Sequence, residues 1–351
     1  MQGKDMTLSA DFFDRPDQFV QWINWEEEIA YIVEMSRSEY EQSAFLDHRI
    51  FEQFDKGALR FPVQDLRKLY AANVKPVSKR CYIFHTTFCG STLLARSLNN
   101  PGTCLAYKEP LALHDFSFVA RDKSRAPEGL DLHQALELVL ATLDRTYSSG
   151  EVPLIKPSDS ANILMQEVLS RGQQTSAVLL YSSFDSFAVS ALQHKIRREF
   201  VRSHINRSRG DLELLGFPHV AKDEYTDAEA VGLFWYAMMA LHNHILSKDC
   251  FRVCSLNSAS MYEDPETVLT KVSQFFGLTY PEGYFEREVR EGAFTRDSKD
   301  DSAVYDPEAA KIRNAQRRAK WADEIADARG FLERLCAARD VPEVLPRSVL
   351  A

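Results

Sequence analysis

The chain has 351 residues, of which 45% are hydrophobic and 26% charged, with 51 Asp and Glu against 42 Lys and Arg. The resulting net charge of −9 argues against nucleic-acid binding through a generally basic surface, and no stretch approaches the roughly 18 apolar residues that a membrane span requires. The six cysteines form no CxxC pair and no zinc-ligand spacing, and the N-terminus has no apolar run. We therefore expect free thiols, no metal site and a cytoplasmic protein.

Residues 1–75 are predicted to form a helical extension packed on the core. The apolar residues that recur there at helical spacing are Phe19, Trp22, Ile23, Ile29, Ile32 and Val33. No alternation of strands with helices is visible in this segment.

Residues 76–351 are predicted to form a doubly wound α/β domain. Five short apolar runs alternate with helical segments, at 81–84, 103–107, 152–156, 176–181 and 250–256. This alternation predicts a mainly parallel sheet of about five strands with helices on both faces. Ligands of such sheets bind outside the carboxyl ends of the strands. The polar stretches 206–225 and 292–307 are predicted to be a mobile flap over the substrate and a second long loop, and residues 308–339 a charged helix.

An anion-binding turn is predicted after the first of these strands. Residues 84–94 read FHTTFCGSTLL and run from strand through turn into helix. The amides of Gly90, Ser91 and Thr92 would converge at the helix N-terminus, where the helix dipole favours an anion. The alternative interpretation is an ordinary turn in which Ser or Thr caps the helix. Because the turn contains no lysine, it does not match GxxxxGKS or GxxxxGKT, which disfavours an ATP or GTP hydrolase.

Five segments, in order along the chain, resemble motifs of the P-loop sulfotransferase family, in particular its bacterial Stf-type and tyrosylprotein branches. They are CGSTL (89–93), YKEPLAL (107–113), LIKPSDS (154–160), LLYSSFDSFAVSAL (179–192) and SMYEDPETVLTKVSQFFGL (260–278). The resemblance implies a P-loop nucleotide-binding fold. It also implies transfer of a sulfuryl group, without a metal, from 3′-phosphoadenosine 5′-phosphosulfate (PAPS) to a hydroxyl of a small molecule or a peptide.

The resemblance also implies roles for individual residues. Glu109 would take the proton of the acceptor hydroxyl, and Lys156 would stabilise charge on the transferring group. The residues that would hold the donor are Cys89, Gly90, Ser91, Thr92, Ser182 and Ser190. The alternatives are a carboxylate that favours a helix N-terminus for Glu109 and a lysine in a surface turn for Lys156.

Two positions depart from the family pattern. The basic residue of the loop is Phe88 here, and the arginine of the 3′-phosphate element is Ser182. The cations that could replace them are Lys195, Arg197, Arg198 and Lys299. These departures leave open a catalytically degenerate nucleotide-binding or regulatory protein, and a small-molecule kinase with a degenerate loop is a third hypothesis. No segment carries a recognisable code for the acceptor or for the oligomeric state.

The remaining titratable residues have structural interpretations. His85 lies in the loop and is a rival base, although a hydrogen-bonded structural role fits it better. His114 and His242 resemble ordinary hydrogen-bonded histidines of helices. Cys89 follows Phe88 at the predicted helix N-terminus, where its thiol pKa should be lowered.

Overall fold

The central element of the protein is a five-stranded sheet. The computed structural model describes residues 8–73, 79–172, 174–218, 220, 222, 224–248, 250–297, 300–304, 307–337 and 340–351. The sheet strands are β4 (Arg80–His85), β5 (Cys104–Lys108), β6 (Val152–Lys156), β7 (Thr175–Tyr181) and β8 (Arg252–Asn257), in the order β5-β6-β4-β7-β8. β5 pairs parallel with β6, and β7 pairs parallel with β8. The strands are almost wholly buried, as expected when helices cover both faces. The predicted α/β fold class is confirmed.

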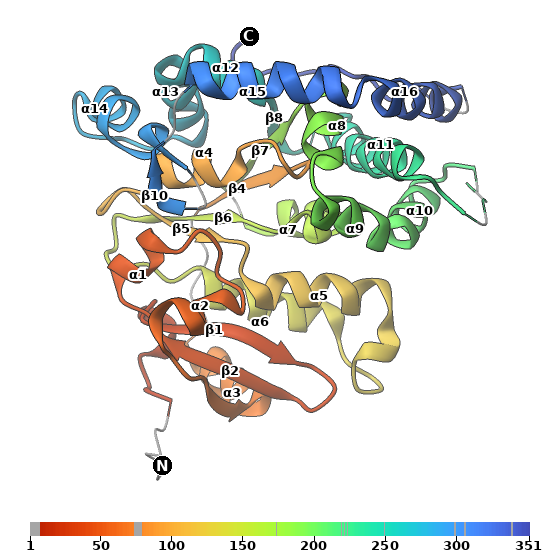
Figure 1. The fold of residues 1–351 in the computed structure, drawn as a ribbon. Helices are drawn as coiled ribbons and strands as arrows, with labels where there is room; N and C mark the ends of the chain where they lie inside the picture. Colours follow the sequence, from red (N-terminus) through yellow and green to blue (C-terminus); the bar gives the residue numbers. More distant parts are fainter. Residues whose placement is uncertain are drawn as a thin grey trace. The chain divides into compact units, whose positions relative to one another are not determined.

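The chain divides into two compact units, of which the first comprises Met1–Cys81, Asn99–Ala161 and Gly172–Gln174. It holds β5, β6 and a three-stranded antiparallel sheet of β1 (Gln18–Asn24), β2 (Ile29–Glu34) and β3 (Leu59–Pro62). Its α-helices are α1 (Arg37–Gln42), α2 (Arg49–Phe54), α3 (Val63–Ala72), α5 (Leu111–Arg121) and α6 (Leu132–Leu143). Helix α5 packs on β1 and on α6, as Figure 1 shows.

The prediction that residues 1–75 are helical is wrong for the segments that form β1, β2 and β3. In β1 the reason is a β-bulge, where the register to β2 shifts between Val20 and Trp22. An extra residue in one strand breaks the two-residue alternation of buried side chains. The apolar residues of β1 therefore fall at spacings of three and four, which are the spacings of a helix.

The second unit comprises Tyr82–Leu98, Asn162–Arg171 and Thr175–Ala351. Its first six α-helices are α4 (Ser91–Leu98), α7 (Met165–Leu169), α8 (Phe184–Leu192), α9 (Lys195–Ser203), α10 (Ile205–Leu214) and α11 (Asp227–Leu246). The others are α12 (Ser258–Glu263), α13 (Pro265–Phe276), α14 (Tyr284–Glu291), α15 (Pro307–Lys320) and α16 (Ala322–Cys336). Helix α11 is the apolar centre of this unit and packs against α8, α9, α10 and α16 (Figure 1). A capping box between Thr226 and Glu229 fixes the start of α11.

Two predicted loops contain regular structure instead. Helix α10 occupies the first half of the segment 206–225, because Ser208, Asp211 and Leu212 give one buried face against α11. The segment 292–307 contains the antiparallel strands β9 (Arg296–Asp297) and β10 (Asp300–Val304). In the part of the chain that the structure describes, no helix is both long and apolar enough to cross a membrane.

Candidate functional site

The turn between β4 and α4, in the second unit, has the backbone of an anion-binding loop. Thr87, Phe88 and Gly90 all have left-handed backbone angles, with φ of 58°, 52° and 79°. These residues lead into α4, and the first amides of a helix are the position that favours an anion. Ser91 and Thr92 begin the helix and are buried. No acidic residue lies in its first turn to compete for an anion.

Two features of Gly90 favour glycine at this position. Its φ lies in the left-handed region, and a Cβ atom there would lie 2.9 Å from Tyr262 Oη and 3.4 Å from Met261 Cε. Both neighbours belong to the segment 260–278, so the structure brings two of the five resembling segments into contact. The Tyr262 side chain is 50% exposed.

Hydrogen bonds within the second unit fix the rest of the turn. The Thr87 amide donates to His85 Nδ1 at 3.1 Å, and Asn162 Nδ2 donates to the His85 carbonyl at 3.0 Å. The Thr86 amide donates to the Leu180 carbonyl at 3.1 Å. His85 is therefore a structural residue of the turn, which agrees with the interpretation preferred from the sequence.

Cys89 is buried, and its thiol contacts the Leu180 carbonyl at 3.7 Å. This contact places a thiol hydrogen toward a carbonyl oxygen. A thiol acting as a donor suits a structural role better than the activated thiolate that the helix N-terminus suggested.

Three buried polar atoms around this turn have no hydrogen-bond partner among the described residues. They are Thr86 Oγ1, Asn162 Oδ1 and Ser182 Oγ, in side chains that are at most 2% exposed. Thr86 and Ser182 directly follow β4 and β7, and the Thr86 amide donates to the Leu180 carbonyl of β7. Buried polar atoms are nearly always hydrogen-bonded in folded proteins. Unpartnered polar atoms around a helix N-terminus therefore fit a polar ligand.

The structure also places the residues predicted to hold the 3′-phosphate. Arg198 lies 3.0 Å from Asp227 and 3.9 Å from Glu324, and its guanidinium stacks on Trp321. The carbonyl of Ser190 accepts a hydrogen bond of 2.9 Å from Arg197 Nη1. Lys299 lies outside the described residues.

In the first unit, Glu109 and Lys156 form a joined pair at the carboxyl ends of β5 and β6. The Glu109 amide donates to the Lys156 carbonyl at 2.6 Å, and Lys156 Nζ forms an ion pair with Glu109 Oε1. The Lys156 side chain is 1% exposed and that of Glu109 is 21% exposed. Lys156 Nζ also lies 5.5 Å from the ring centroid of Phe45. Lys108 points elsewhere, to the Tyr40 carbonyl at 2.6 Å, so Lys156 is the lysine that pairs with Glu109.

Glu109 has a left-handed backbone, with φ of 53°. This conformation is unfavourable for a residue with a side chain, and such strain persists mainly where the surroundings fix it, often at functional sites. Here the hydrogen bond to Lys156 fixes it. A strained carboxylate that keeps part of its surface exposed, beside a buried lysine, is consistent with an acid–base role.

A second side-chain contact joins the segments that follow β5 and β6. His114 lies five residues after Glu109, Ser158 lies two residues after Lys156, and His114 Nδ1 is 2.7 Å from Ser158 Oγ. Burial raises the pKa of the neighbouring Asp115 to about 6. The Asp115 carboxyl, in α5, thus exchanges its proton closer to neutral pH than an ordinary aspartate does.

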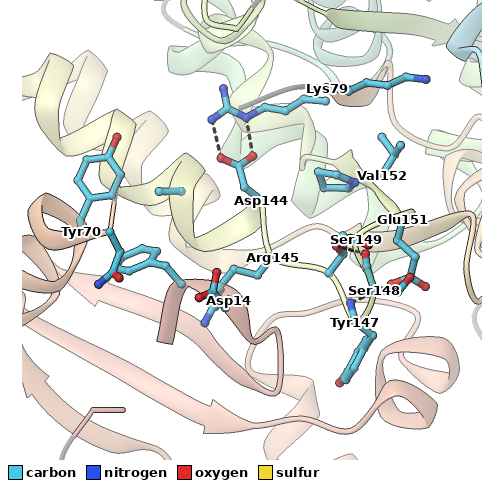
Figure 2. Close-up of a pocket in the computed structure, with 16 residues that line it drawn as sticks. Asp14, Tyr70, Lys79, Asp144, Arg145, Tyr147, Ser148, Ser149, Glu151 and Val152 are labelled. Carbon is cyan, nitrogen blue, oxygen red and sulfur yellow. Dashed lines mark hydrogen bonds and ion pairs between the residues drawn. The ribbon is translucent and has the colours of Figure 1, made fainter. Parts of the chain in front are cut away.

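A separate hollow of about 430 Å³ lies in the first unit, at the end of β6 opposite Lys156 (Figure 2). Asp144 and Arg80 form a two-pronged ion pair in it, at 2.6 and 2.7 Å, and Tyr70 and Glu151 line other walls. None of the predicted site residues lines this hollow. In the described residues, no group of three or more His, Cys, Asp and Glu side chains is arranged to hold a metal ion.

Comparison with known proteins gives structural similarity alone. No family model and no curated protein matches the chain. The solved structures that it resembles include three sulfotransferases and a retinol dehydratase. One is a sulfotransferase domain from the curacin biosynthetic pathway, with 13% identity, a TM-score of 0.40, and coverage of 78% of this chain and 100% of that one.

Two further structures match at a similar level. A sulfotransferase domain from the Synechococcus PCC 7002 olefin synthase has 16% identity and a TM-score of 0.40, covering 77% of this chain and 98% of that one. Retinol dehydratase, solved with retinol and PAP, has 12% identity and a TM-score of 0.37, covering 82% and 90%. Similarity this low carries no argument about activity, so the function has to be argued from the residues of the two units.

Proposed function

We propose that the protein transfers a sulfuryl group from PAPS to a hydroxyl group of a small molecule or a peptide. The observation that carries this proposal is the turn that leads into the N-terminus of α4, around which three buried polar atoms have no partner among the described residues. A helix N-terminus of this kind suits an anion. The second requirement, a base beside a buried cation, is met by Glu109 and Lys156.

Both groups of residues follow strands of the same sheet. The turn follows β4, and Glu109 and Lys156 follow β5 and β6. Open α/β sheets bind ligands outside the carboxyl ends of their strands. This rule supports a ligand-binding role for each group.

The proposed chemistry assigns one task to each residue. Glu109 accepts the proton of the acceptor hydroxyl while the new bond between oxygen and sulfur forms. The bond between sulfur and the phosphate oxygen breaks, and its electron pair leaves with adenosine 3′,5′-bisphosphate. Lys156 stabilises the negative charge that develops on the bridging oxygen. Lys156 binds Glu109, so an anionic donor would compete with the carboxylate for the ammonium group and release Glu109 to act as the base.

The proposal predicts binding of adenosine 3′,5′-bisphosphate in the micromolar range without magnesium. Isothermal titration calorimetry on the folded protein measures it, with adenosine 5′-monophosphate as the comparison that lacks the 3′-phosphate. Absence of heat with the bisphosphate would count against the proposal. Magnesium-dependent binding of ATP in its place would support the kinase hypothesis.

A second candidate function is a nucleotide-binding or regulatory protein without catalysis. Phe88 and Ser182 favour it, because two cations expected at the donor are absent from these positions. Under this reading the bisphosphate binds, but Glu109→Gln leaves the cellular phenotype intact. We also propose a reducing, cytoplasmic setting, because all six cysteines are free thiols.

A further inference from the structure

We propose that Arg197, carried on the ring of Phe88, is the cation that replaces the missing basic residue of the anion-binding loop. The inference rests on the proposed function and names the residue that adapts this chain's loop to an anionic ligand. Arg197 Cζ lies 4.9 Å from the ring centroid of Phe88. That distance is within the range in which a guanidinium is attracted to the face of an aromatic ring.

Phe88 is suited to this task by its place in the turn. Phe88 lies within the loop, between Thr87 and Cys89, and has a left-handed backbone. Its ring is therefore attached directly to the loop. The ring contacts Phe187 at 5.7 Å and Phe200 at 6.0 Å between centroids. These neighbours from α8 and α9 hold the ring in place. A cation bound to its face is therefore positioned relative to the loop amides.

A second contact directs Arg197 toward the predicted donor site. Its Nη1 donates to the carbonyl of Ser190, at 2.9 Å, seven residues earlier on the chain. Ser190 is one of the residues that the resemblance assigns to the donor. The guanidinium of Arg197 thus contacts Phe88, which belongs to the anion-binding loop, and Ser190, which belongs to a second segment expected to bind the donor. The guanidinium is planar, has five N–H donors and is always charged, which suits a phosphate or sulfate oxygen.

The other arginines of α9 are held elsewhere. Arg198 is paired with Asp227 and Glu324, and Arg202 is paired with Asp227. Both are anchored by carboxylates. The contact of Arg197 with the ring of Phe88, a residue of the loop itself, is therefore what favours Arg197 over Arg198.

The test is calorimetry of two anions, adenosine 3′,5′-bisphosphate and inorganic phosphate, with the full-length protein and its variants. Arg197→Ala is expected to weaken binding of each anion by about 10- to 100-fold, the usual effect of losing one charge-assisted hydrogen bond. Arg202→Ala removes the same charge from the same helix and is expected to change binding less than about 2-fold, as for a screened surface charge. In the Arg197→Ala background, Phe88→Arg is expected to restore most of the binding, because it returns a guanidinium to the loop.

The outcomes separate this inference from the proposed function. If the bisphosphate binds and Arg197→Ala behaves like Arg202→Ala, the inference is overturned while the proposed function stands. If phosphate binds in an Arg197-dependent way but the bisphosphate does not, the inference stands and the assigned donor is wrong. If neither anion binds to the folded wild-type protein, both are overturned.

Discussion

Replacing Glu109 by Gln is expected to slow sulfuryl transfer by about 10²- to 10⁴-fold, because the amide keeps the shape of the side chain but cannot accept the proton. Lys156→Met is expected to cost about 10²- to 10³-fold, since it removes a buried charge that stabilises the leaving oxygen. The measurement is release of ³⁵S from labelled PAPS to water or to a panel of alcohols, phenols and tyrosine peptides.

The matched control is the ion pair between Glu39 and Lys56, which lies in the same unit. Lys56 Nζ is 2.6 Å from Glu39 Oε2, and both side chains are about as shielded as that of Glu109. Glu39→Gln and Lys56→Met are expected to leave the transfer rate unchanged. Thermal melting followed by circular dichroism verifies that each variant is folded. Equal rates for the Glu109 variant and its Glu39 control would show that Glu109 is not the base.

Replacing His242 by Leu is expected to stabilise the protein, and to do so more strongly in acid. His242 lies in α11 with no exposed surface, and neither ring nitrogen has a partner among the described residues. The interpretation of His242 as a hydrogen-bonded helix histidine is therefore wrong. Removing two unpartnered polar atoms in a side chain of similar volume should raise the free energy of unfolding by about 1–3 kcal/mol at pH 7.5.

The direction of the pH dependence follows from burial. Burial lowers the pKa of His242 to about 3 in the folded protein, against an ordinary value near 6.5 in the unfolded chain. Below pH 6.5 the unfolded chain gains the proton and the folded protein does not, so stability is lost as the pH falls toward 3. At pH 4.5 the advantage of His242→Leu should grow by a further 2–3 kcal/mol or so.

Urea unfolding at pH 7.5 and pH 4.5 measures both effects. His133→Gln is the control, because it removes an exposed histidine of the first unit instead of a buried one. A stability difference between wild type and His242→Leu that is the same at both pH values would contradict this account of His242.

Much of the sheet could be predicted because its strands are continuous apolar runs. The run 152–156 coincides with β6, and the other four predicted runs overlap β4, β5, β7 and β8. A strand that is buried on both faces is a nearly continuous apolar run, and this run can be recognised without knowing which strands pair with it. β1 was different: its bulge changes the spacing of buried residues, and that change depends on pairing with β2.

The contacts of the site were less predictable than its residues. The sequence placed Glu109 and Lys156 at strand ends, but it contained no sign that the Glu109 backbone is left-handed and bonded to Lys156. The approach of Tyr262 to Gly90 joins residues more than 170 positions apart. The stacking of Arg197 on Phe88 likewise depends on how α9 packs in the second unit. Such contacts arise from tertiary packing, which one-dimensional spacing does not encode.

The most direct test of the central claim is a crystal structure of the protein with adenosine 3′,5′-bisphosphate. We predict that the 5′-phosphate lies within hydrogen-bonding distance of the amides of Gly90, Ser91 and Thr92, with Lys156 and Glu109 facing it. A nucleotide bound elsewhere, for example in the hollow beside Arg80 and Asp144, or a loop whose amides face away from it, would contradict the proposed sulfotransferase site.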